Sequence, residues 1–156
     1  MVLCPQNFTD HFTLNTSHSS PHPALGIDFG DSRIGIAASD PVGIMAHPVE
    51  TIHVHKTDAL SRIAEIIQQR GIRTLVIGLP LRLDGSEGDA VKKVRSFAQK
   101  LEAQHPQLPL HFTDETFTTV TASAKLHEAG KNAKKQKHLI DQAAAVEILH
   151  AWMEGE

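Results

Sequence analysis

The sequence has a single cysteine, Cys4, and no hydrophobic run long enough to cross a membrane. One cysteine cannot form a disulfide within the chain, which favours a reducing compartment, and we expect the protein in the cytoplasm. A membrane-spanning helix needs about 18 consecutive apolar residues, so we expect no membrane partner. The N-terminus also lacks the order of a signal peptide, in which a basic segment precedes an apolar one.

The chain has no excess of positive charge. Its 15 Lys and Arg residues stand against 18 Asp and Glu residues, which gives a formal net charge of −3. A surface that binds nucleic acid must therefore be a local patch. The rest of the composition, 40% hydrophobic and 21% charged over 156 residues, is typical of one globular domain.

Residues 1–23 are rich in Asn, Thr, Ser, His and Pro, and their apolar residues follow no period. This composition predicts a disordered or loosely attached N-terminal arm. We expect a single folded domain over residues 24–156.

The hydrophobic pattern of that domain predicts an α/β fold in which strands and helices alternate. The expected strands are a hairpin over 24–39 with its turn at 30–32, a third strand over 47–55, and two more over 73–80 and 109–115. The expected helices cover 60–70, 86–104, 122–129 and 139–153, with a basic loop over 131–138. His53 and His55 fall on one face of the third strand, and we expect that face to meet solvent.

Three acids fall where the expected elements end or turn. Asp28 lies between Gly26 and Gly30 in the first strand, Glu115 ends the last strand, and Asp141 lies in the first turn of the last helix. Sites of open α/β sheets gather at the carboxyl ends of parallel strands. Converging carboxylates would repel one another unless a divalent cation such as Mg²⁺ or Mn²⁺ neutralises them, and two such ions can cleave phosphodiesters.

The pattern alone leaves each acid an ordinary alternative. Asp28 could face solvent at a strand end, and Glu115 could be a plain loop acid. Asp141 could favour the positive end of its helix. Spacing along the chain does not decide whether the three acids meet.

Several short motifs, together with their order, identify a family. They are Leu25-Gly26-Ile27-Asp28-Phe29-Gly30, Arg33-Ile34-Gly35, Ser39-Asp40-Pro41, Gly78-Leu79-Pro80-Leu81, Asp84-Gly85-Ser86-Glu87-Gly88, Asp114-Glu115, Thr118-Thr119 and Asp141-Gln142-Ala143-Ala144. In this order, from Leu25 to Met153, the chain resembles the YqgF family, also called RuvX, of Holliday-junction-resolvase-like, pre-16S ribosomal RNA nucleases.

The resemblance implies a ribonuclease H-like fold, with a five-stranded mixed sheet flanked by helices. It implies a metal-dependent nuclease that processes pre-16S ribosomal RNA, with a ribosomal precursor particle as its partner. By motif position, Asp28, Glu115 and Asp141 correspond to the catalytic acids that bind Mg²⁺ or Mn²⁺.

Two positions depart from the family pattern. Thr116 stands where the family usually has Arg, and Arg82 stands where it usually has Asn. The loss of an Arg removes a fork that could clamp a phosphate, and Arg82 offers a charge from another loop. The residues that we expect to contact nucleic acid are Arg33, Arg82, Lys131, Lys134, Lys135 and Lys137.

Other functions stay open from the sequence. The same site could resolve branched DNA such as a Holliday junction, or the acids could hold metal in a ribosome-assembly module that does not cleave. An ATP-binding protein is a third class, because an Asp-x-Gly hairpin also binds phosphate in actin-like folds, but 156 residues leave little room for an adenosine domain. The oligomeric state is left open.

Overall fold

A computed structural model describes residues 20–81, 87–114 and 133–155, with the side chains of the last helix described from His138 onward. The strands are β1 (Ala24–Phe29), β2 (Arg33–Ser39), β3 (Ala46–His53), β4 (Thr74–Leu79) and β5 (Leu110–Asp114). The helices are α2 (Ala59–Arg70), α3 (Asp89–Gln104) and α5 (Ala133–Glu154). Within these ranges no helix has both the length and the apolar character to span a membrane.

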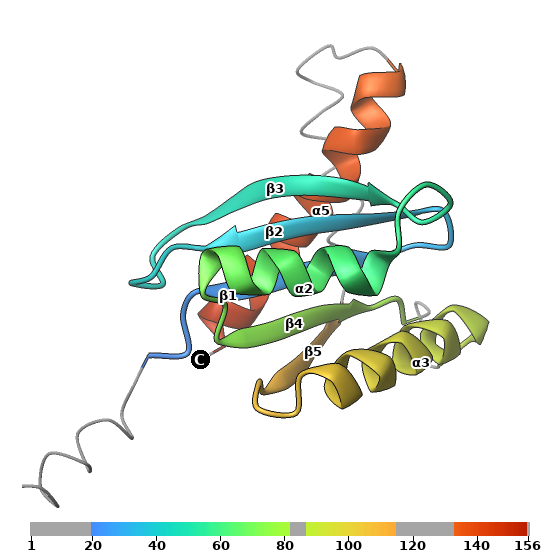
Figure 1. The fold of residues 1–156 in the computed structure, drawn as a ribbon. Helices are drawn as coiled ribbons and strands as arrows, with labels where there is room; N and C mark the ends of the chain where they lie inside the picture. Colours follow the sequence, from blue (N-terminus) through green and yellow to red (C-terminus); the bar gives the residue numbers. More distant parts are fainter. Residues whose placement is uncertain (1–19, 82–86, 115–132, 156) are drawn as a thin grey trace, which may run out of the picture.

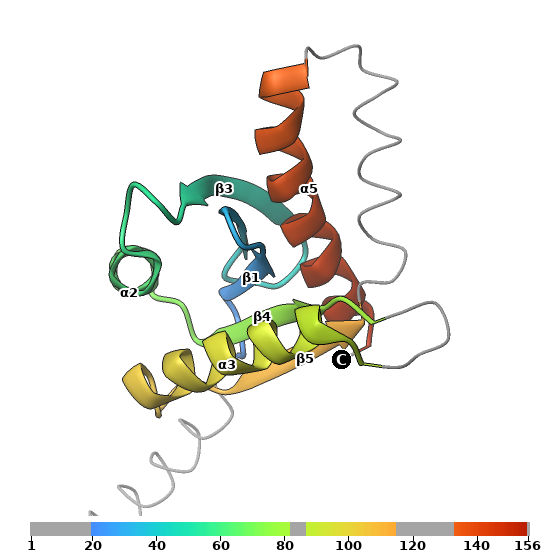
Figure 2. The same ribbon diagram turned by 90° about the vertical axis from the view of Figure 1, so that its right-hand side faces the viewer.

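The strands form one mixed sheet in the order β3-β2-β1-β4-β5. The pairs β1–β2 and β2–β3 are antiparallel, whereas β1–β4 and β4–β5 are parallel. Helices α2 and α3 cover one face of the sheet and α5 crosses the other (Figures 1 and 2). The expected five-stranded mixed sheet flanked by helices is confirmed, and the carboxyl ends of β1, β4 and β5 share one edge.

Side chains of a strand alternate between the two faces, and this alternation divides the core into two layers. Leu25 and Ile27 of β1 pack in the layer under α2 and α3. Ala24 and Val76 pack under α5. All six residues of β4 are buried, because this strand is covered on both faces, as its continuously apolar sequence predicts.

Helix α5 lies unusually close to the sheet at Gly26. A Cβ added at Gly26 would lie 2.6 Å from Cγ of Leu149 and 2.7 Å from the backbone carbonyl oxygen of Ala145. Real Cβ atoms do not come this close to other heavy atoms, so the absence of a side chain on β1 is what admits the helix backbone.

The start of α5 corrects the expectation for the basic segment. Residues 133–138, predicted as a loop, are helical, and Asp141 lies eight residues after the helix start instead of in its first turn. Lys, Gln and Ala are good helix formers, so the helix extends beyond the apolar residues that begin at Leu139. Asp141 is therefore too far from the helix N-terminus to be explained by the helix dipole.

Residues at the end of the predicted arm pack against the domain. His22 is only 6% exposed, and its Nδ1 lies 2.7 Å from the hydroxyl oxygen of Ser39. The hydroxyl of Thr74 donates a hydrogen bond of 2.7 Å to the carbonyl of Pro21. The folded part thus reaches back at least to Pro21, and residues 1–19 of the predicted arm lie outside the described residues.

We expect Gly26→Ala to lower the free energy of unfolding by about 1–3 kcal/mol, because the new methyl group forces α5 away from β1. Gly155→Ala is the matched control, since a Cβ there would meet its nearest atoms at an ordinary 3.6 Å. Urea unfolding of both variants tests the prediction. Equal stability of the two variants would contradict it.

Candidate functional site

Asp28 lies near the carboxyl end of β1 on the face that α5 covers. Its neighbours Ile27 and Phe29 pack in the layer on the opposite face, so the alternation of the strand directs Asp28 to α5. The side chain is half-buried. In the antiparallel pairing with β2, Asp28 stands opposite Gly35.

Gly35 brings Asp28 and Asp141 together. A Cβ added at Gly35 would overlap the backbone carbonyl oxygen of Asp141 and would lie 3.0 Å from its Cβ. Helix α5 therefore crosses β2 at Gly35 with Asp141 at the crossing. Because Asp28 is the cross-strand neighbour of Gly35, two acids separated by more than a hundred residues occupy one place on the sheet.

Arg33 is the described counter-charge of Asp141. Its Nε donates a hydrogen bond of 2.6 Å to Oδ2 of Asp141, and the two side chains are 33% and 17% exposed. Arg33 was expected to contact nucleic acid, and the structure shows it paired with Asp141, one of the three predicted site acids. The sequence gives a partial signal for this contact, because Arg33 and Gly35 share a face of β2.

The third strand holds the same stretch of α5. The Thr51 hydroxyl donates a hydrogen bond of 3.1 Å to the carbonyl of His138, and the side-chain amide of Gln142 donates one of 3.1 Å to the Thr51 hydroxyl. Thr51 stands opposite Gly35 on the other side of β2. Residues from β2 and β3 thus fix the segment of α5 that carries Asp141. Sequence reasoning missed Thr51 and Gln142 because their hydrogen bonds join residues far apart in the chain.

His53 is also engaged by α5. Its ring centroid lies 4.8 Å from that of His138, in an edge-to-face arrangement. Partial removal of the ring from water lowers the pKa of His53, and the neighbouring His138 and Lys56 lower it further. The expectation that both histidines face solvent holds for the exposed His55 and only in part for His53, which is half-buried because its ring contacts His138 of α5.

The third predicted acid, Glu115, lies outside the described residues, as does Asp84. Strand β5 ends one residue earlier, at the exposed Asp114, which stands opposite Leu79 of β4. Since β1, β4 and β5 run parallel, β5 ends at the same edge of the sheet as β1, which carries Asp28. The structure therefore brings together two of the three acids, and the position of Glu115 stays a prediction.

The two described acids offer the donor chemistry of a divalent cation site. Carboxylate oxygens are the ligands that Mg²⁺ and Mn²⁺ prefer. Within residues 20–81, 87–114 and 133–155 no group of three or more His, Cys, Asp or Glu side chains is arranged to hold a metal ion. Asp28 and Asp141 thus fit part of such a site, in which Arg33 now occupies one oxygen of Asp141.

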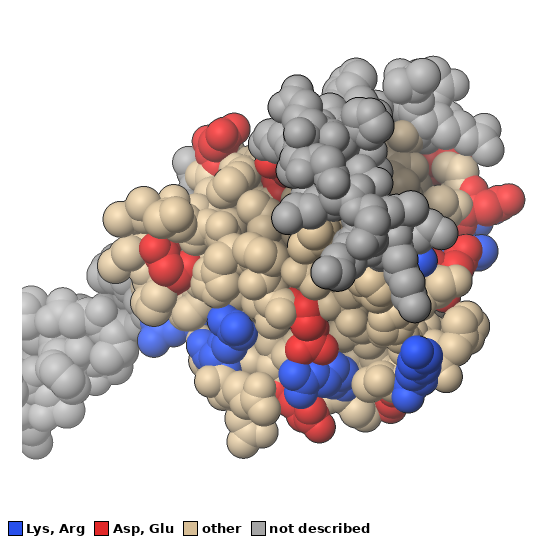
Figure 3. Space-filling model, turned by 90° about the horizontal axis from the view of Figure 1, so that it is seen from above, with Lys and Arg blue, Asp and Glu red and all other residues tan. Residues whose placement is uncertain are grey.

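The other cations expected to contact nucleic acid are placed only in part. Arg82 and Lys131 lie outside the described residues. Lys134, Lys135 and Lys137 lie in the first turns of α5, where the structure describes the backbone alone. Figure 3 shows acidic and basic side chains interspersed on the described part of one face, so no broad basic surface appears there.

The sequence matches known proteins along most of its length. Residues 22–155 match the family RuvX, which is described as a Holliday junction resolvase. A protein of Nocardioides sp. named "Putative pre-16S rRNA nuclease" is 45% identical over 137 residues, which cover 85% of this chain and 87% of the relative. A protein of Nocardia farcinica with the same name is 41% identical over 137 residues, covering 83% and 76% of the two chains.

Solved structures share the fold at much lower identity. The T. thermophilus RuvC in complex with a Holliday junction substrate superposes with a TM-score of 0.52 at 16% identity, over 85% of this chain and 94% of RuvC. The yeast mitochondrial Holliday junction resolvase Ydc2 gives a TM-score of 0.51 at 13% identity, over 85% and 78%. These likenesses confirm the ribonuclease H-like fold, and the match over residues 22–155 shows that the chain belongs to the RuvX family.

Proposed function

We propose that this RuvX-family nuclease hydrolyses phosphodiester bonds of a 16S ribosomal RNA precursor, with a divalent cation held by Asp28, Asp141 and Glu115. The observation that carries the proposal is the meeting of Asp28 and Asp141 at Gly35. Two carboxylates that fold to one place on a sheet edge favour a shared cation, because their mutual repulsion otherwise opposes folding.

RNA is the favoured substrate because relatives with high sequence identity to the chain are named for an RNA substrate. Relatives named for pre-16S rRNA are 41–45% identical over most of the chain. The resolvases that bind or resolve Holliday junctions share the fold at 13–16% identity. The family description as a Holliday junction resolvase keeps branched DNA as the second candidate substrate.

In the proposed reaction the chain supplies ligands, position and a movable counter-charge. Asp28 and Asp141 would hold the cation, and a divalent cation bound there would supply activation of water and stabilisation of the charge that develops on the phosphate. Arg33, which pairs with Asp141 Oδ2 in the structure, would offer its guanidinium to a substrate phosphate if a cation took that oxygen. We also propose that the reaction takes place in the cytoplasm, on a ribosomal precursor particle.

The substrate is tested by incubating the purified protein with pre-16S rRNA and with a four-way DNA junction, each with and without Mn²⁺. We expect Mn²⁺-dependent cleavage of the RNA. We expect Asp28→Asn to reduce its rate at least about a hundredfold, because the variant loses a negatively charged ligand. Cleavage of the junction alone would replace the proposed substrate, and full activity of Asp28→Asn under saturating Mn²⁺ would contradict the site.

Arg33 and the cation compete for Asp141, which predicts a difference in thermal stabilisation by Mn²⁺. Arg33→Gln should lower the stability of the metal-free protein by about 1–2 kcal/mol, a value between those of exposed and buried ion pairs. Mn²⁺ should then raise the melting temperature of Arg33→Gln more than that of the parent protein.

Arg62→Gln is the matched control for this experiment. Arg62 also forms an ion pair of 2.6 Å, with Glu50, at similar exposures of 31% and 29%, but it lies between α2 and β3 away from the acids. Its variant should show the same response to Mn²⁺ as the parent. An equal response of both variants would mean that Arg33 does not compete with a cation.

The lysines at the start of α5 precede Asp141 on the same helix, so we propose that they bind the RNA backbone. Replacing Lys134, Lys135 and Lys137 by Gln should weaken RNA binding regardless of sequence. It should also flatten the dependence of log K on log salt by about two units. Replacing Lys56, Arg70 and Arg73 by Gln removes the same charge elsewhere and should leave the slope near that of the parent. Equal slopes for both triple variants would contradict the role of the α5 lysines.

A further inference from the structure

A pocket lies on the opposite face of the sheet from Asp141, between α3 and the segment that leads into α2. Its volume is about 570 Å³, and Phe29, Ile34, Val54, Leu60 and Phe97 contribute apolar walls. The rings of Phe29 and Phe97 are 4.7 Å apart and inclined at 33° to each other. This hollow, here the Phe29–Phe97 pocket, has the size of a small-ligand site. Its aromatic wall is the half-buried ring of Phe29, backed by Phe97, which is only 8% exposed.

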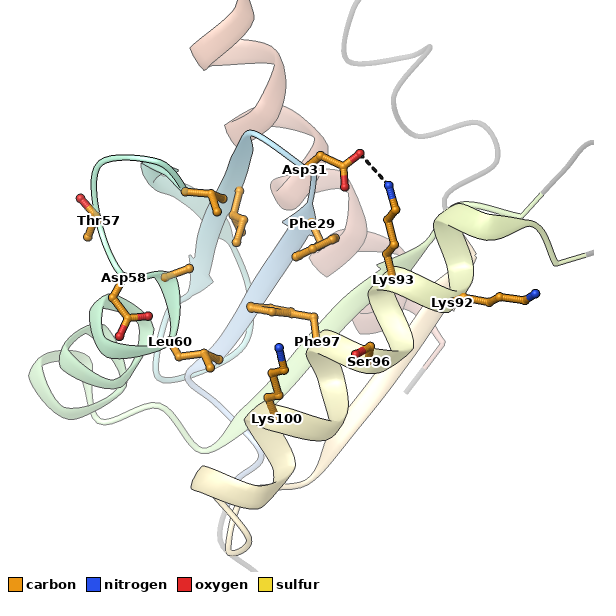
Figure 4. Close-up of a pocket in the computed structure, with 13 residues that line it drawn as sticks. Phe29, Asp31, Thr57, Asp58, Leu60, Lys92, Lys93, Ser96, Phe97 and Lys100 are labelled. Atoms are coloured by element: carbon orange, nitrogen blue, oxygen red, sulfur yellow. Dashed lines mark hydrogen bonds and ion pairs between the residues drawn. The ribbon is translucent and has the colours of Figure 1, made fainter.

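Cations border the pocket on its α3 side. Figure 4 shows the side chains of Lys93 and Lys100 directed toward the hollow, whereas Lys92 points away from it. Lys93 Nζ lies 3.2 Å from a carboxylate oxygen of Asp31, and both partners are more than half exposed, so the pair is weak and can exchange. Lys100 has no ion-pair partner among the residues that the structure describes, so its charge is available to an anion.

The pocket continues to the edge of the sheet that carries Asp28. A second hollow of about 240 Å³ shares Phe29, Asp31 and Lys93 with it and reaches Gly30 and Pro80. Gly30 and Pro80 directly follow β1 and β4 at their carboxyl ends. The two hollows therefore adjoin at Phe29 and at the Lys93–Asp31 ion pair, and the second hollow reaches this edge.

We propose that the Phe29–Phe97 pocket binds one nucleotide of single-stranded RNA, with its base against the ring of Phe29 and its phosphates at Lys93 and Lys100. An aromatic wall beside cations matches a base that is linked to a phosphate. The proposal rests on the proposed function for the identity of the strand. Asp28 and Phe29 are consecutive residues on opposite faces, so an RNA that passes over this edge brings a neighbouring phosphodiester to the catalytic acids.

A free mononucleotide has the same chemistry as one unit of the strand. We favour the strand because the second hollow adjoins the pocket at Lys93 and reaches Gly30 and Pro80 at the sheet edge. A free mononucleotide in the pocket would leave this second hollow empty.

The test measures the affinity of the full chain for a fluorescent uridine oligoribonucleotide in a chelating buffer, where no divalent cation supports cleavage. Lys93→Gln combined with Lys100→Gln should weaken binding about tenfold and reduce the salt slope by about 1.4 units. The control is Arg70→Gln combined with Arg73→Gln, which removes two exposed charges outside the pocket and should leave affinity unchanged. Equal affinity of the two double variants, or no binding by the parent, would overturn the proposal.

A second comparison tests base stacking. Phe29→Leu keeps an apolar wall but removes the partly exposed ring, and it should weaken binding of the uridine oligomer several-fold. It should not weaken binding of an abasic oligomer of equal length, a difference that damage to the fold would not produce. Equal loss for both oligomers, or displacement of the uridine oligomer by uridine monophosphate at a similar concentration, would overturn the strand-binding role.

The binding test of the pocket can be interpreted independently of whether the protein hydrolyses the precursor RNA. Because binding is measured without a divalent cation, loss of affinity in the pocket variants supports the pocket even if the parent fails to cleave the precursor RNA. If the parent cleaves this RNA with Mn²⁺ and the Lys93 and Lys100 double variant binds as the parent does, the pocket proposal fails and the proposed function stands.

Discussion

The contact between α5 and the sheet at two glycines is the constraint on which the candidate site depends. At Gly26 the helix approaches β1 through Ala145 and Leu149, and at Gly35 it approaches β2 through the backbone of Asp141. These two contacts fix both the position and the rotation of the helix on the sheet. A side chain at Gly35 would displace Asp141 directly. Among the described residues, Asp141 is the only acid that meets Asp28 at this crossing.

Bringing two carboxylates together has an electrostatic cost, and Arg33 offsets it. Its ion pair with Asp141 lies on the same face of β2 as Gly35, where Thr51 and Gln142 hold the helix by hydrogen bonds. The arrangement supplies positive charge to the acids while no metal is bound. In the proposed function the same arginine would be available to a phosphate if a cation took its place on Asp141.

The last two residues of β1 point to opposite faces of the sheet. Asp28 faces α5 and Phe29 faces α3, because consecutive residues of a strand point in opposite directions. Asp28, one of the proposed metal-binding acids, and the Phe29–Phe97 pocket are therefore neighbours across one sheet edge, although no helix is common to both. A nucleic acid strand is a suitable ligand for such an edge, because it is long enough to contact both faces at once.

The sequence by itself determined the order of the described strands and helices, the hairpin around Asp28, the doubly covered strand β4 and, through its motifs, the family. These features follow from local periodicity and turn chemistry, which depend only on short stretches of the chain. The helix expected over 122–129 lies outside the described residues. The sequence misplaced the start of α5, because the basic residues 133–138 form helix without an apolar stripe. Only the tertiary structure decided that Asp28 meets Asp141, that Arg33 pairs with Asp141 and that His53 contacts α5. Each of these contacts joins residues far apart in the chain, and each depends on how closely two glycines allow a helix to approach a sheet.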